Sequence, residues 1–599
     1  MTLCDYLFAN YEYIISVDSE FRIIAGGTPA VVCFVYQDLK TGEVWDCTKP
    51  EDILNLPFPH DEAVYIVFNA VAEGNAWLAW NIPLPEFVID LWVEYKNLVQ
   101  DGVGREKGFF SMLSACRRLG VEAKYITSEE EKELWRDLII NQTNYTDKEL
   151  RGIIRYCRSD VIMTGKLLPL ILKHIEIRLS YAEHETRLMQ ILLRGRGKLL
   201  ESQVIHYGIA VDNDKLNLFN EHWPQAKENF IKKQDKGLNC FEDGVFKQEK
   251  FKALIIKNNL FDKFPRTAKG NLKSDEKTLE LYDSYPDLNK LRKLRKIAGS
   301  GKMLGYNIGP DNRSRTELHW FSTVTGRTAA SSSKYPFGPS KWVRELIKPP
   351  TGFTYAYIDY RHQEPCIQAY LSRDQNLIQA VESGDIYIST AKLSKAVPDT
   401  ATKQSHPEER GKFKIGFLMN GYGAGSQSMA IKLKGSNLEA KEVQSSIKRA
   451  YATYFKWSGE RVNIIRKQGR LQTKFGWTRH MPATETPTTN SLANWPIQAT
   501  GAEMTRLWMI LLLDAGIEVH ATVHDAVLIL VPNKDRETRI ALAQELGADA
   551  AELVVDKRIG TEVEIIEGNW KQPRTPNGDG DGDLFDSIFE EIEKVANGK

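Results

Sequence analysis

Cysteine is scarce in this sequence and is never paired at close spacing. The seven cysteines among 599 residues are scattered along the chain, and no two of them form a Cys-x-x-Cys pair. This pattern predicts neither a zinc site nor a disulfide framework. It fits a reducing, cytoplasmic setting, which would be the host cytoplasm if the protein is viral.

Long apolar runs are also lacking, and positive and negative charges cancel. No stretch of about 18 apolar residues occurs, so we expect no membrane span and no membrane partner. The N-terminal segment carries acids early and has no basic stretch followed by a long apolar one, so we expect no signal peptide. The formal net charge of zero argues against a wholly basic nucleic-acid binder but allows local basic surfaces.

The chain is long enough for several domains. Residues 1–178 alternate strand-like and helix-like stretches, which indicates an α/β unit. Residues 179–300 have the pattern of long, polar-rich helices. Residues 571–599 open with Pro and Gly and are acidic, which predicts a flexible tail with a short amphipathic helix. In residues 301–570, strand-like segments flank a strongly helical middle. This pattern divides the region into 301–400, 401–490 and 491–570.

Two isolated aspartates lie in apolar, strand-like runs. In ATVHDAVLIL the ionisable pair His524 and Asp525 precedes a strand that buries both faces, and in FTYAYIDYRHQE Asp359 ends a similar run. Asp525 is either a solvated hairpin corner or a metal ligand at a hairpin tip, because a buried carboxylate is costly without a cation. If the two strands are adjacent, the aspartates can share two divalent cations about 4 Å apart, as phosphoryl transfer requires. Carboxylate oxygens favour Mg²⁺.

A helical segment between these aspartates combines two cations with an apolar and an aromatic side chain. In ERGKFKIGFLMNGYGAG a spacing of four places on one face Arg410, Lys414, Leu418 and Tyr422. This face is either a solvated basic surface that ends at Gly423 or a site for a nucleoside triphosphate. In the second case the cations would hold phosphate oxygens and Tyr422 would stack near a base.

Residues 301–570 resemble the family A DNA polymerases. DYRHQE, RGKFKIGFLMNGYG and VHDA resemble the family's motifs A, B and C. The resemblance implies metal-binding roles for Asp359 and Asp525 and a sugar-gating role for Glu364. It implies that the other nucleotide-binding residues are Arg410, Lys414, Leu418, Tyr422 and His524. TVTGRTAASS and ANWPIQATGAE look like the template and primer-template contacts, which gives as DNA-binding residues Arg327, Asn494 and Gln498.

Three positions depart from the pattern of that family. Ala526 stands where an acidic residue is usual, which leaves Asp359 and Asp525 as the main ligands. Leu418 stands where Phe or Tyr is usual, and the residues after Tyr360 differ from the common Ser-Gln-Ile-like run. These departures concern nucleotide selection rather than the reaction. Some phages that use 2-aminoadenine in place of adenine carry divergent polymerases of this family, a branch to which this chain could belong.

The N-terminal unit carries a second set of carboxylates. SVDSEF puts Asp18 and Glu20 on one face of a strand, a pattern that also suits a half-exposed edge strand. YCRSD puts Tyr156 and Asp160 one helical turn apart. These segments resemble the first and third motifs of the DEDD-class 3′→5′ exonuclease domain, and Glu73 in FNAVAEGNAW stands where the second motif has Asp. The resemblance implies metal ions held by Asp18, Glu20 and Asp160, with Glu73 and Tyr156 as further catalytic residues.

Two further segments point to partners. A cationic cluster at the end of the 179–300 helices includes Lys293 and Arg295, which we expect to contact DNA phosphates, although a charge run is usually only a solvated face. In the acidic tail, DLFDSIF carries a compact apolar face that the tail cannot bury alone. This face either docks on a replisome partner such as a sliding clamp or belongs to a solvated terminus.

Together these patterns predict a template-directed, DNA-dependent DNA polymerase with 3′→5′ proofreading that replicates a phage genome. The expected fold is an α/β, RNase H-like exonuclease domain followed by a right-hand α+β polymerase, with a thumb at 179–300, a palm at 301–400 and 491–570, and fingers at 401–490. Each active site would hold two Mg²⁺, with Mn²⁺ as a substitute. The partners would be primer-template DNA, dNTPs and a single-stranded 3′ end. Two alternatives stay open: a replication or repair scaffold that binds DNA with decayed active sites, and a single-subunit RNA polymerase.

Overall fold

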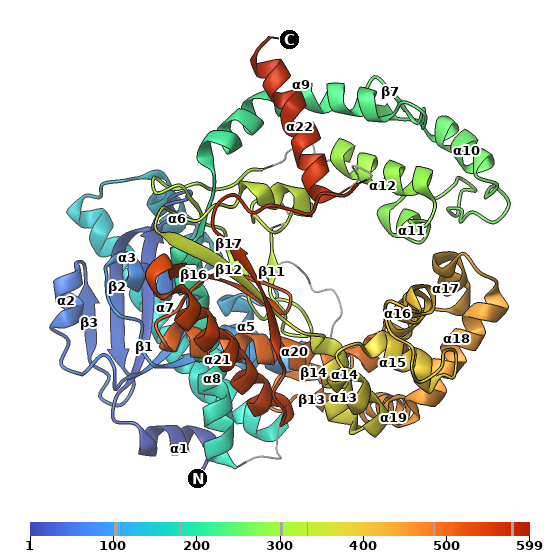
Figure 1. Ribbon diagram of the computed structural model, residues 1–599. Helices are drawn as coiled ribbons and strands as arrows, with labels where there is room; N and C mark the ends of the chain where they lie inside the picture. The colour runs from blue at the N-terminus through green and yellow to red at the C-terminus, as the bar shows by residue number, and fades with distance from the viewer. Residues whose placement is uncertain are drawn as a thin grey trace.

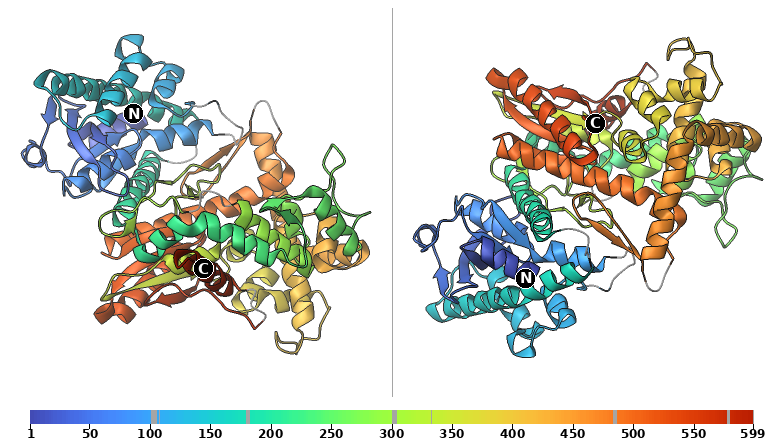
Figure 2. Two further views of the ribbon diagram at one scale, coloured as in Figure 1. Left: turned by 90° about the horizontal axis from the view of Figure 1, so that it is seen from above. Right: turned by 90° about the horizontal axis from the view of Figure 1, so that it is seen from below.

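The computed structural model describes residues 1–100, 106, 108–178, 183–299, 304–331, 333–482, 486–576 and 580–598. Figure 1 shows a central sheet with an N-terminal α/β unit on one side, a helical lobe on the other and a helical arm above. In both views of Figure 2 the N-terminal unit lies to one side of the remainder. Among the described residues no helix is long and apolar enough to cross a membrane.

The N-terminal unit (residues 1–178) is built on a mixed five-stranded sheet, as its alternating pattern predicts. The strands are β1 Ile14–Arg22, β2 Ala30–Asp38, β3 Val44–Cys47, β4 Val64–Val67 and β5 Phe87–Asp90, in the order β3-β2-β1-β4-β5. β1 pairs antiparallel with β2 and parallel with β4. The helices are α1 Leu3–Asn10, α2 Pro50–Leu54, α3 Val71–Ala79, α4 Leu91–Val99, α5 Met112–Leu119, α6 Glu129–Asn141 and α7 Asp147–Arg178. α7 packs on β1 and β2, so the longest helix spans the sheet that carries the first carboxylates.

The helix α8 (His184–Tyr207) joins the N-terminal unit to the remainder. It packs on α3 and β5 on one side and on the central unit on the other, and Figure 2 shows it between the two. Two ion pairs fix it: Arg194 donates to both carboxylate oxygens of Glu94 in the N-terminal unit at 2.7 and 2.8 Å, and Arg196 lies 2.7 Å from Asp514 of the central unit. Within the helix, Lys198 lies 2.7 Å from Glu201. A side chain at Gly195 would meet the β5 backbone, so the close approach of helix and strand requires glycine there.

The central unit is an antiparallel four-stranded sheet backed by two helices. The strands are β12 Phe353–Tyr360, β15 Glu518–Val523, β16 Ala526–Pro532 and β17 Thr561–Ile566, in the order β15-β16-β12-β17. β16 is apolar and buried along nearly its whole length, as the sequence pattern predicts. The backing helices α20 (Thr489–Asp514) and α21 (Arg536–Val555) pack on each other, and α21 also packs on β12 and β16. Short paired strands complete this region and the arm: β6 Ile209–Ala210 with β9 Arg313–Ser314, β7 Phe241–Glu242 with β8 Val245–Phe246, β10 Leu318–His319 with β11 Ala329–Ala330, and β13 Arg470–Gln472 with β14 Thr478–His480.

The arm and the lobe are helical, and each has its own apolar core. The arm (residues 213–299) comprises α9 Asn213–Gln234, α10 Gln248–Lys257, α11 Glu276–Glu280 and α12 Pro286–Gly299. The lobe comprises α13 Gln363–Ser372, α14 Gln375–Glu382, α15 Ile386–Leu393, α16 Pro407–Gly421, α17 Ser426–Leu433, α18 Asn437–Ala450 and α19 Ala452–Gln468. The two parts touch each other: Lys432 of α17 donates to the carbonyl of Glu280 at 2.8 Å and lies 3.7 Å from Asp283. Thus the arm meets the lobe as well as the central unit.

The C-terminal segment differs from its prediction. It does form an amphipathic helix, α22 (Asp581–Ala596), but the helix packs against α9 of the arm, which it crosses in Figure 1. Its apolar face is buried in the core of the arm and is made of Phe585, Ile588, Phe589 and Ile592. Arg574 fastens the approach to this helix by bonding both Glu345 and Asp586 at 2.8 Å. The predictions of a flexible tail and of an apolar face left for a partner are therefore wrong, because this chain covers the face itself.

Truncation of α22 at its arm contact should destabilise the protein. Phe589 is 7% exposed and its ring packs 6.2 Å from that of Phe219 on α9. Phe589→Ala should lower the free energy of unfolding by about 3 kcal/mol, because a buried aromatic ring is lost and a cavity remains. Denaturant unfolding measures this loss. Leu438→Ala, at a position 69% exposed, is the control and should change stability by less than about 0.5 kcal/mol. Equal effects of the two substitutions would mean that α22 is not held on α9.

Candidate active sites

Strand pairing brings Asp359 and Asp525 together. In the β12–β16 ladder Asp359 lies opposite Ala526, and Asp525 immediately precedes Ala526. Asp525 and His524 form the two-residue turn between β15 and β16, where Val523 pairs with Ala526. His524 has φ of 58°, a left-handed conformation of the kind that tight hairpin turns need. The hairpin tip is thus next to the end of β12, as the hypothesis of adjacent strands requires.

The two carboxylates are compensated only in part by positive charge, from Lys341 near Asp359 and from Arg327 near Asp525. Burial, together with the charges of the neighbouring carboxylates of Asp525 and Glu562, raises the pKa of Asp359 to about 7. Burial also raises the pKa of Asp525. One oxygen of Asp359, Oδ1, is buried and has no hydrogen-bond partner among the described residues. A divalent cation bound by Asp359 and Asp525 would satisfy this oxygen and remove the repulsion, so the donor set fits a hard metal ion.

A third carboxylate approaches this site from β17. Glu562 lies opposite Asp359 in the β12–β17 ladder, so both side chains project from the same face of the sheet. Its side chain is 71% exposed and accepts from Arg361 Nε at 3.2 Å. Ala526, by contrast, is fully buried and offers no ligand. Sequence reasoning did not single out Glu562; the only signal was the alternation of acidic and apolar residues in TEVEII.

Glu364 connects three segments beside the paired aspartates. From the first turn of α13 it accepts a hydrogen bond from Arg327 Nη2 at 2.7 Å and another from the Tyr422 hydroxyl at 3.0 Å. The segment that carries Arg327 is fixed by hydrogen bonds to the carbonyls of Val324 and Gly326; the donors are Trp477, Trp495 and Arg506. Arg327 and Tyr422 are 95 residues apart in the chain, so no local pattern indicates that one carboxylate joins them.

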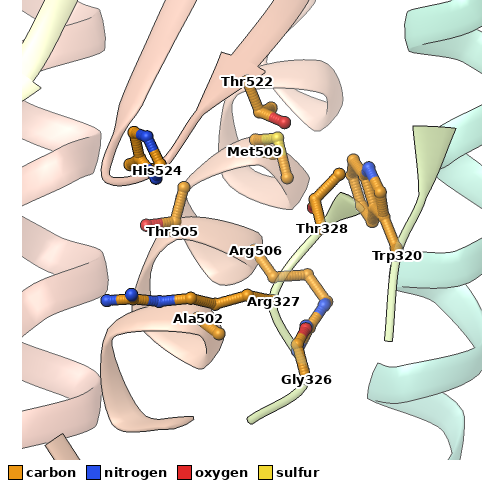
Figure 3. A pocket seen from close by; sticks show the side chains of 10 residues that line it. All are labelled: Trp320, Gly326, Arg327, Thr328, Ala502, Thr505, Arg506, Met509, Thr522 and His524. Atoms are coloured by element: carbon orange, nitrogen blue, oxygen red, sulfur yellow. The ribbon is translucent and has the colours of Figure 1, made fainter. Parts of the chain in front are cut away.

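A small cavity of about 40 Å³ separates the hairpin tip from the segment around Arg327. Figure 3 shows that its walls come from the hairpin, from α20 and from residues 320–328, with Arg506 bent toward Gly326. His524 and Arg327 both line it. Arg506 is buried against the Phe321 ring at 3.7 Å, and burial lowers its pKa to about 10. Arg506 therefore supports the wall, whereas His524 and Arg327 are candidates for contact with a ligand.

The predicted face of α16 is the one that α16 exposes. Lys414, Leu418 and Tyr422 are exposed, whereas the opposite face is buried in the core of the lobe. The Arg410 Nε donates to Asp385 Oδ2 at 2.6 Å, which holds the guanidinium near the first turn of α15. Leu418 is 39% exposed and Tyr422 is 53% exposed, so both side chains are accessible beside Lys414. The face is therefore open to a ligand with anionic and apolar parts.

The predicted DNA-binding residues lie in two places. Asn494 and Gln498 are one turn apart on the partly exposed face of α20, next to the buried Trp495. Lys293 lines a groove of about 1070 Å³ between the arm, the segment 340–342 and α22. Arg295 points into the arm instead, since it donates to the Ser274 carbonyl and stacks on the Phe246 ring at 4.1 Å. Of the two cations expected on the arm, only Lys293 lines this groove.

The N-terminal unit gathers its predicted carboxylates into one buried cluster. The ligand atoms of Asp18, Glu20 and Cys157 lie within 4.8 Å of one another. Burial, followed by the charge of Asp160, raises the pKa of Asp18 to about 8. Glu73 is 2% exposed, and burial and the charge of Asp18 raise its pKa well above the ordinary value. Glu73 Oε2 and Asp160 Oδ1 are buried without a hydrogen-bond partner in the described structure, so this donor set also fits cations.

A lysine that sequence reasoning missed reaches this cluster. Lys132 of α6 lies 2.7 Å from Asp160 Oδ2, and its Nζ is 5.6 Å from the centre of the Tyr156 ring. The cluster opens into a cleft of about 820 Å³. The cleft is lined by Asp18, Asp160 and Lys132, by the aromatic residues Phe68, Trp92, Phe109 and Phe110, and by the cations Arg117, Arg118, Arg136 and Lys198. Lys132 lies within an acid-rich run, SEEEKELWRD, which gave no sign of this role.

Comparisons with known proteins agree with this geometry. The family model described as DNA polymerase family A matches residues 246–572. A DNA polymerase I of Aquifex aeolicus is 23% identical over 451 residues, which are 70% of this chain and 75% of that protein. A DNA polymerase of Mycobacterium phage D29 is 29% identical over 240 residues, or 39% of this chain and 37% of that protein. The polymerase domain of Pol1 from M. smegmatis, solved with DNA primer-template and dNTP, has a TM-score of 0.70 at 18% identity and covers 94% of this chain and 97% of its own. This last likeness shows the fold.

The burial of Asp359, with the added repulsion of Asp525 and Glu562, should appear as a pH-dependent loss of stability. The pKa of Asp359 is about 7 in the folded protein against an ordinary value of 3.8, so the folded state holds this proton more tightly than the unfolded state. Stability should therefore fall as pH rises from about 4 to about 7. With a chelator present to remove metal ions, Asp359→Asn should raise the free energy of unfolding at pH 8 by on the order of 1 kcal/mol, a figure reduced for solvent screening. At pH 5 the increase should be smaller.

Thermal or denaturant unfolding at the two pH values measures this difference. Asp399→Asn, at an exposed position, is the matched control and should leave stability unchanged at both. A gain from Asp359→Asn that is the same at pH 5 and pH 8 would show that the ionisation of Asp359 is not its source.

Proposed function

Because the chain belongs to DNA polymerase family A, we propose that it extends a primer by template-directed transfer of nucleotides from dNTPs. The observation that carries this proposal is the placement of Asp359 and Asp525 side by side at the end of β12. In this proposal the central unit is the palm and comes from parts of 301–400 and 491–570, and the arm with residues 179–300 is the thumb. The lobe is the fingers; it lies within 401–490 and also includes, through α13, α14 and α15, residues 363–393 of the part predicted as palm. The helix α22 then belongs to the thumb.

Asp359 and Asp525 would hold the metal ions, which we take to be Mg²⁺ with Mn²⁺ as a substitute. Such ions supply charge stabilisation to the attacking and leaving oxygens of an in-line displacement. The protein's own contribution is to hold the two carboxylates in register. The primer 3′-oxygen then forms a bond to the α-phosphorus, the bond to the β-phosphate oxygen breaks, and pyrophosphate leaves.

The exposed face of α16 suits the incoming nucleotide. Arg410 and Lys414 would bind the departing phosphates, and Tyr422 would stack near the base. Glu364 would lie under the sugar and exclude a 2′-hydroxyl, a position supported by its hydrogen bonds to Tyr422 and Arg327. Leu418 offers no hydroxyl to the sugar, and His524 at the hairpin tip would contact the nucleotide or the primer end.

Primer-template DNA would lie against the thumb and α20. Arg327, Asn494 and Gln498 would contact the strands near the active site, and Lys293 would contact backbone phosphates along the groove. The resemblance to the phage D29 polymerase supports a role in phage genome replication.

Two other functions use the same fold: a DNA-binding scaffold with decayed sites and an RNA polymerase. The intact pair of aspartates argues against the first, and Glu364 beside the sugar position argues against the second.

Loss of one aspartate should abolish synthesis but leave DNA binding. Asp525→Asn should slow primer extension on the order of a thousandfold or more with either Mg²⁺ or Mn²⁺, because charge stabilisation of the transition state is lost. The affinity for primer-template should stay within a few fold, because the phosphate contacts lie elsewhere. Gel-based extension and fluorescence anisotropy measure the two effects, with Asp399→Asn as control. Extension at a near wild-type rate by Asp525→Asn would refute the assignment, and wild-type protein inactive with both dNTPs and rNTPs would favour the scaffold.

We further propose that the N-terminal unit is a 3′→5′ exonuclease with an RNase H-like fold. The strand order β3-β2-β1-β4-β5, the clustered carboxylates and the cleft with aromatic and cationic walls support this proposal. Asp18, Glu20 and Asp160 would hold the metal ions, and Glu73 would add a fourth carboxylate. Tyr156 would orient a water that attacks phosphorus, so that the bond to the 3′-oxygen breaks and a mononucleotide leaves.

Substitution in the carboxylate cluster should separate the two activities. Asp18→Ala should abolish metal-dependent degradation of single-stranded and mispaired 3′ ends, while primer extension stays near wild type. Glu73→Ala should be nearly as damaging, because Glu73 lies buried in the same cluster. Release of labelled mononucleotides over time measures degradation. Wild-type protein that leaves a single strand intact over long incubation with Mg²⁺ or Mn²⁺ would show that the unit is not a nuclease.

A further inference from the structure

Lys132 is placed to bind the substrate phosphate in the N-terminal site. We propose that it is a positioning residue: one N–H of its ammonium holds Asp160, and the remaining donors bind the terminal phosphodiester of a single-stranded 3′ end. This inference rests on the proposed exonuclease function of the unit. It adds a cation to a site in which the sequence motifs supply only carboxylates and a tyrosine.

The position of Lys132 is fixed by the protein around it. Ser128 caps the start of α6 by accepting from Glu131 N at 3.1 Å. Just before it, Thr127 shares a hydrogen bond of 2.9 Å with Ser159, the neighbour of Asp160 on α7. The Lys132 side chain is 13% exposed and that of Asp160 is 7% exposed. The lysine is therefore directed into the cluster by two anchored helix segments rather than lying on the surface by chance.

The contact with Asp160 leaves room for both a cation and a phosphate. Lys132 bonds Oδ2 of Asp160, whereas Oδ1 is buried and has no hydrogen-bond partner among the described residues. Oδ1 can thus ligate a metal ion while Oδ2 keeps its lysine. An ammonium group has three N–H donors, and Asp160 uses one of them. The other two point to a ligand that accepts hydrogen bonds and carries negative charge, as a phosphodiester does.

The lining of the cleft around Lys132 favours single-stranded nucleic acid as the ligand. Its walls carry aromatic rings on which bases can stack and arginines that can contact a backbone, as in other sites for single-stranded nucleic acid. Glu106, Glu129 and Glu133 also line the cleft, and Arg117 is paired with Glu129 at 2.9 Å. Lys132 lines this cleft together with Asp18 and Asp160, so it lies at the end where the carboxylates are. Arg136, one helical turn further along α6, lines the same cleft and is exposed. The two cations of α6 would contact successive phosphates, with Lys132 on the one nearest the carboxylates.

A different reading is that Lys132 only neutralises Asp160 and is displaced by a metal ion. The two readings differ in what Lys132→Met does to phosphate binding. In chelator, the affinity for a single-stranded oligonucleotide should depend on salt, and loss of one phosphate contact should reduce the slope of log affinity against log salt by about 0.7. We compare Asp160→Asn with Asp160→Asn/Lys132→Met, because in this background the lysine has no carboxylate at position 160 to neutralise.

The expected result is a smaller salt slope in the double variant. In the wild-type background, Lys132→Met should lower kcat for degradation on the order of a hundredfold. Lys132→Arg should keep part of the activity that Lys132→Met loses. Calorimetry should show that Lys132→Met leaves the affinity for Mn²⁺ unchanged. Lys124→Met is the control, since Lys124 is 63% exposed and pairs with Glu122 outside the cleft. Primer extension should be unchanged in every variant, which reports that the chain is folded.

Two results would overturn the proposal. An unchanged salt slope in the double variant would exclude a phosphate contact, whether or not the protein degrades DNA. Tighter Mn²⁺ binding with faster degradation in Lys132→Met would show that the lysine competes with the metal. If wild-type protein degrades nothing, the exonuclease function fails, and the salt slope still decides whether Lys132 binds a phosphate.

Discussion

The antiparallel pairing of β12 with β16 is the constraint on which the polymerase site depends. It holds Asp359 beside the turn that carries Asp525. A slip of one residue in this ladder would move Asp359 to the opposite face of the sheet, because side chains alternate along a strand. The register is maintained by the buried apolar residues of β16, which outweigh the repulsion between the aspartates. Packing energy is thus what keeps two like charges together.

The two carboxylate sites handle that repulsion differently. At the end of β12 the described structure has no cation bonded to Asp359 or Asp525, and the strain appears as a raised pKa. In the N-terminal cluster Lys132 already compensates part of the charge, although burial still raises the pKa of Asp160. Removal of a carboxylate should therefore reduce the electrostatic repulsion at the end of β12 without a further cost. In the N-terminal cluster, removal of Asp160 would also leave the buried Lys132 without its partner, which is destabilising.

Local patterns in the sequence predicted much of this arrangement. The apolar runs ending at Asp359 and starting after Asp525 gave both strands, and a spacing of four gave the exposed face of α16. Contacts between segments that are distant in the chain could not be predicted, because no local sequence pattern indicates them. The hydrogen bonds from Arg327 and Tyr422 to Glu364 are one example, and the approach of Lys132 to Asp160 is another. The C-terminal helix itself was predicted correctly from its amphipathic pattern, but its packing was not, because no local pattern indicates that the α9 surface covers its apolar face.

The contact between α17 and the arm has a topological consequence. The arm and the lobe are each attached to the central unit, and Lys432 joins them a second time through Glu280 and Asp283. The three parts therefore form a closed circuit, and its closing contact also includes Ile431 packed on the core of the arm and Lys434 placed 5.3 Å from the centre of the Tyr285 ring. The ionic part of this contact contributes about 1 kcal/mol or less, and added salt weakens it, whereas the apolar part does not depend on salt in this way. A closed circuit has no open side, so a long duplex in the place between arm and lobe would have to enter by its end unless α17 separates from the arm.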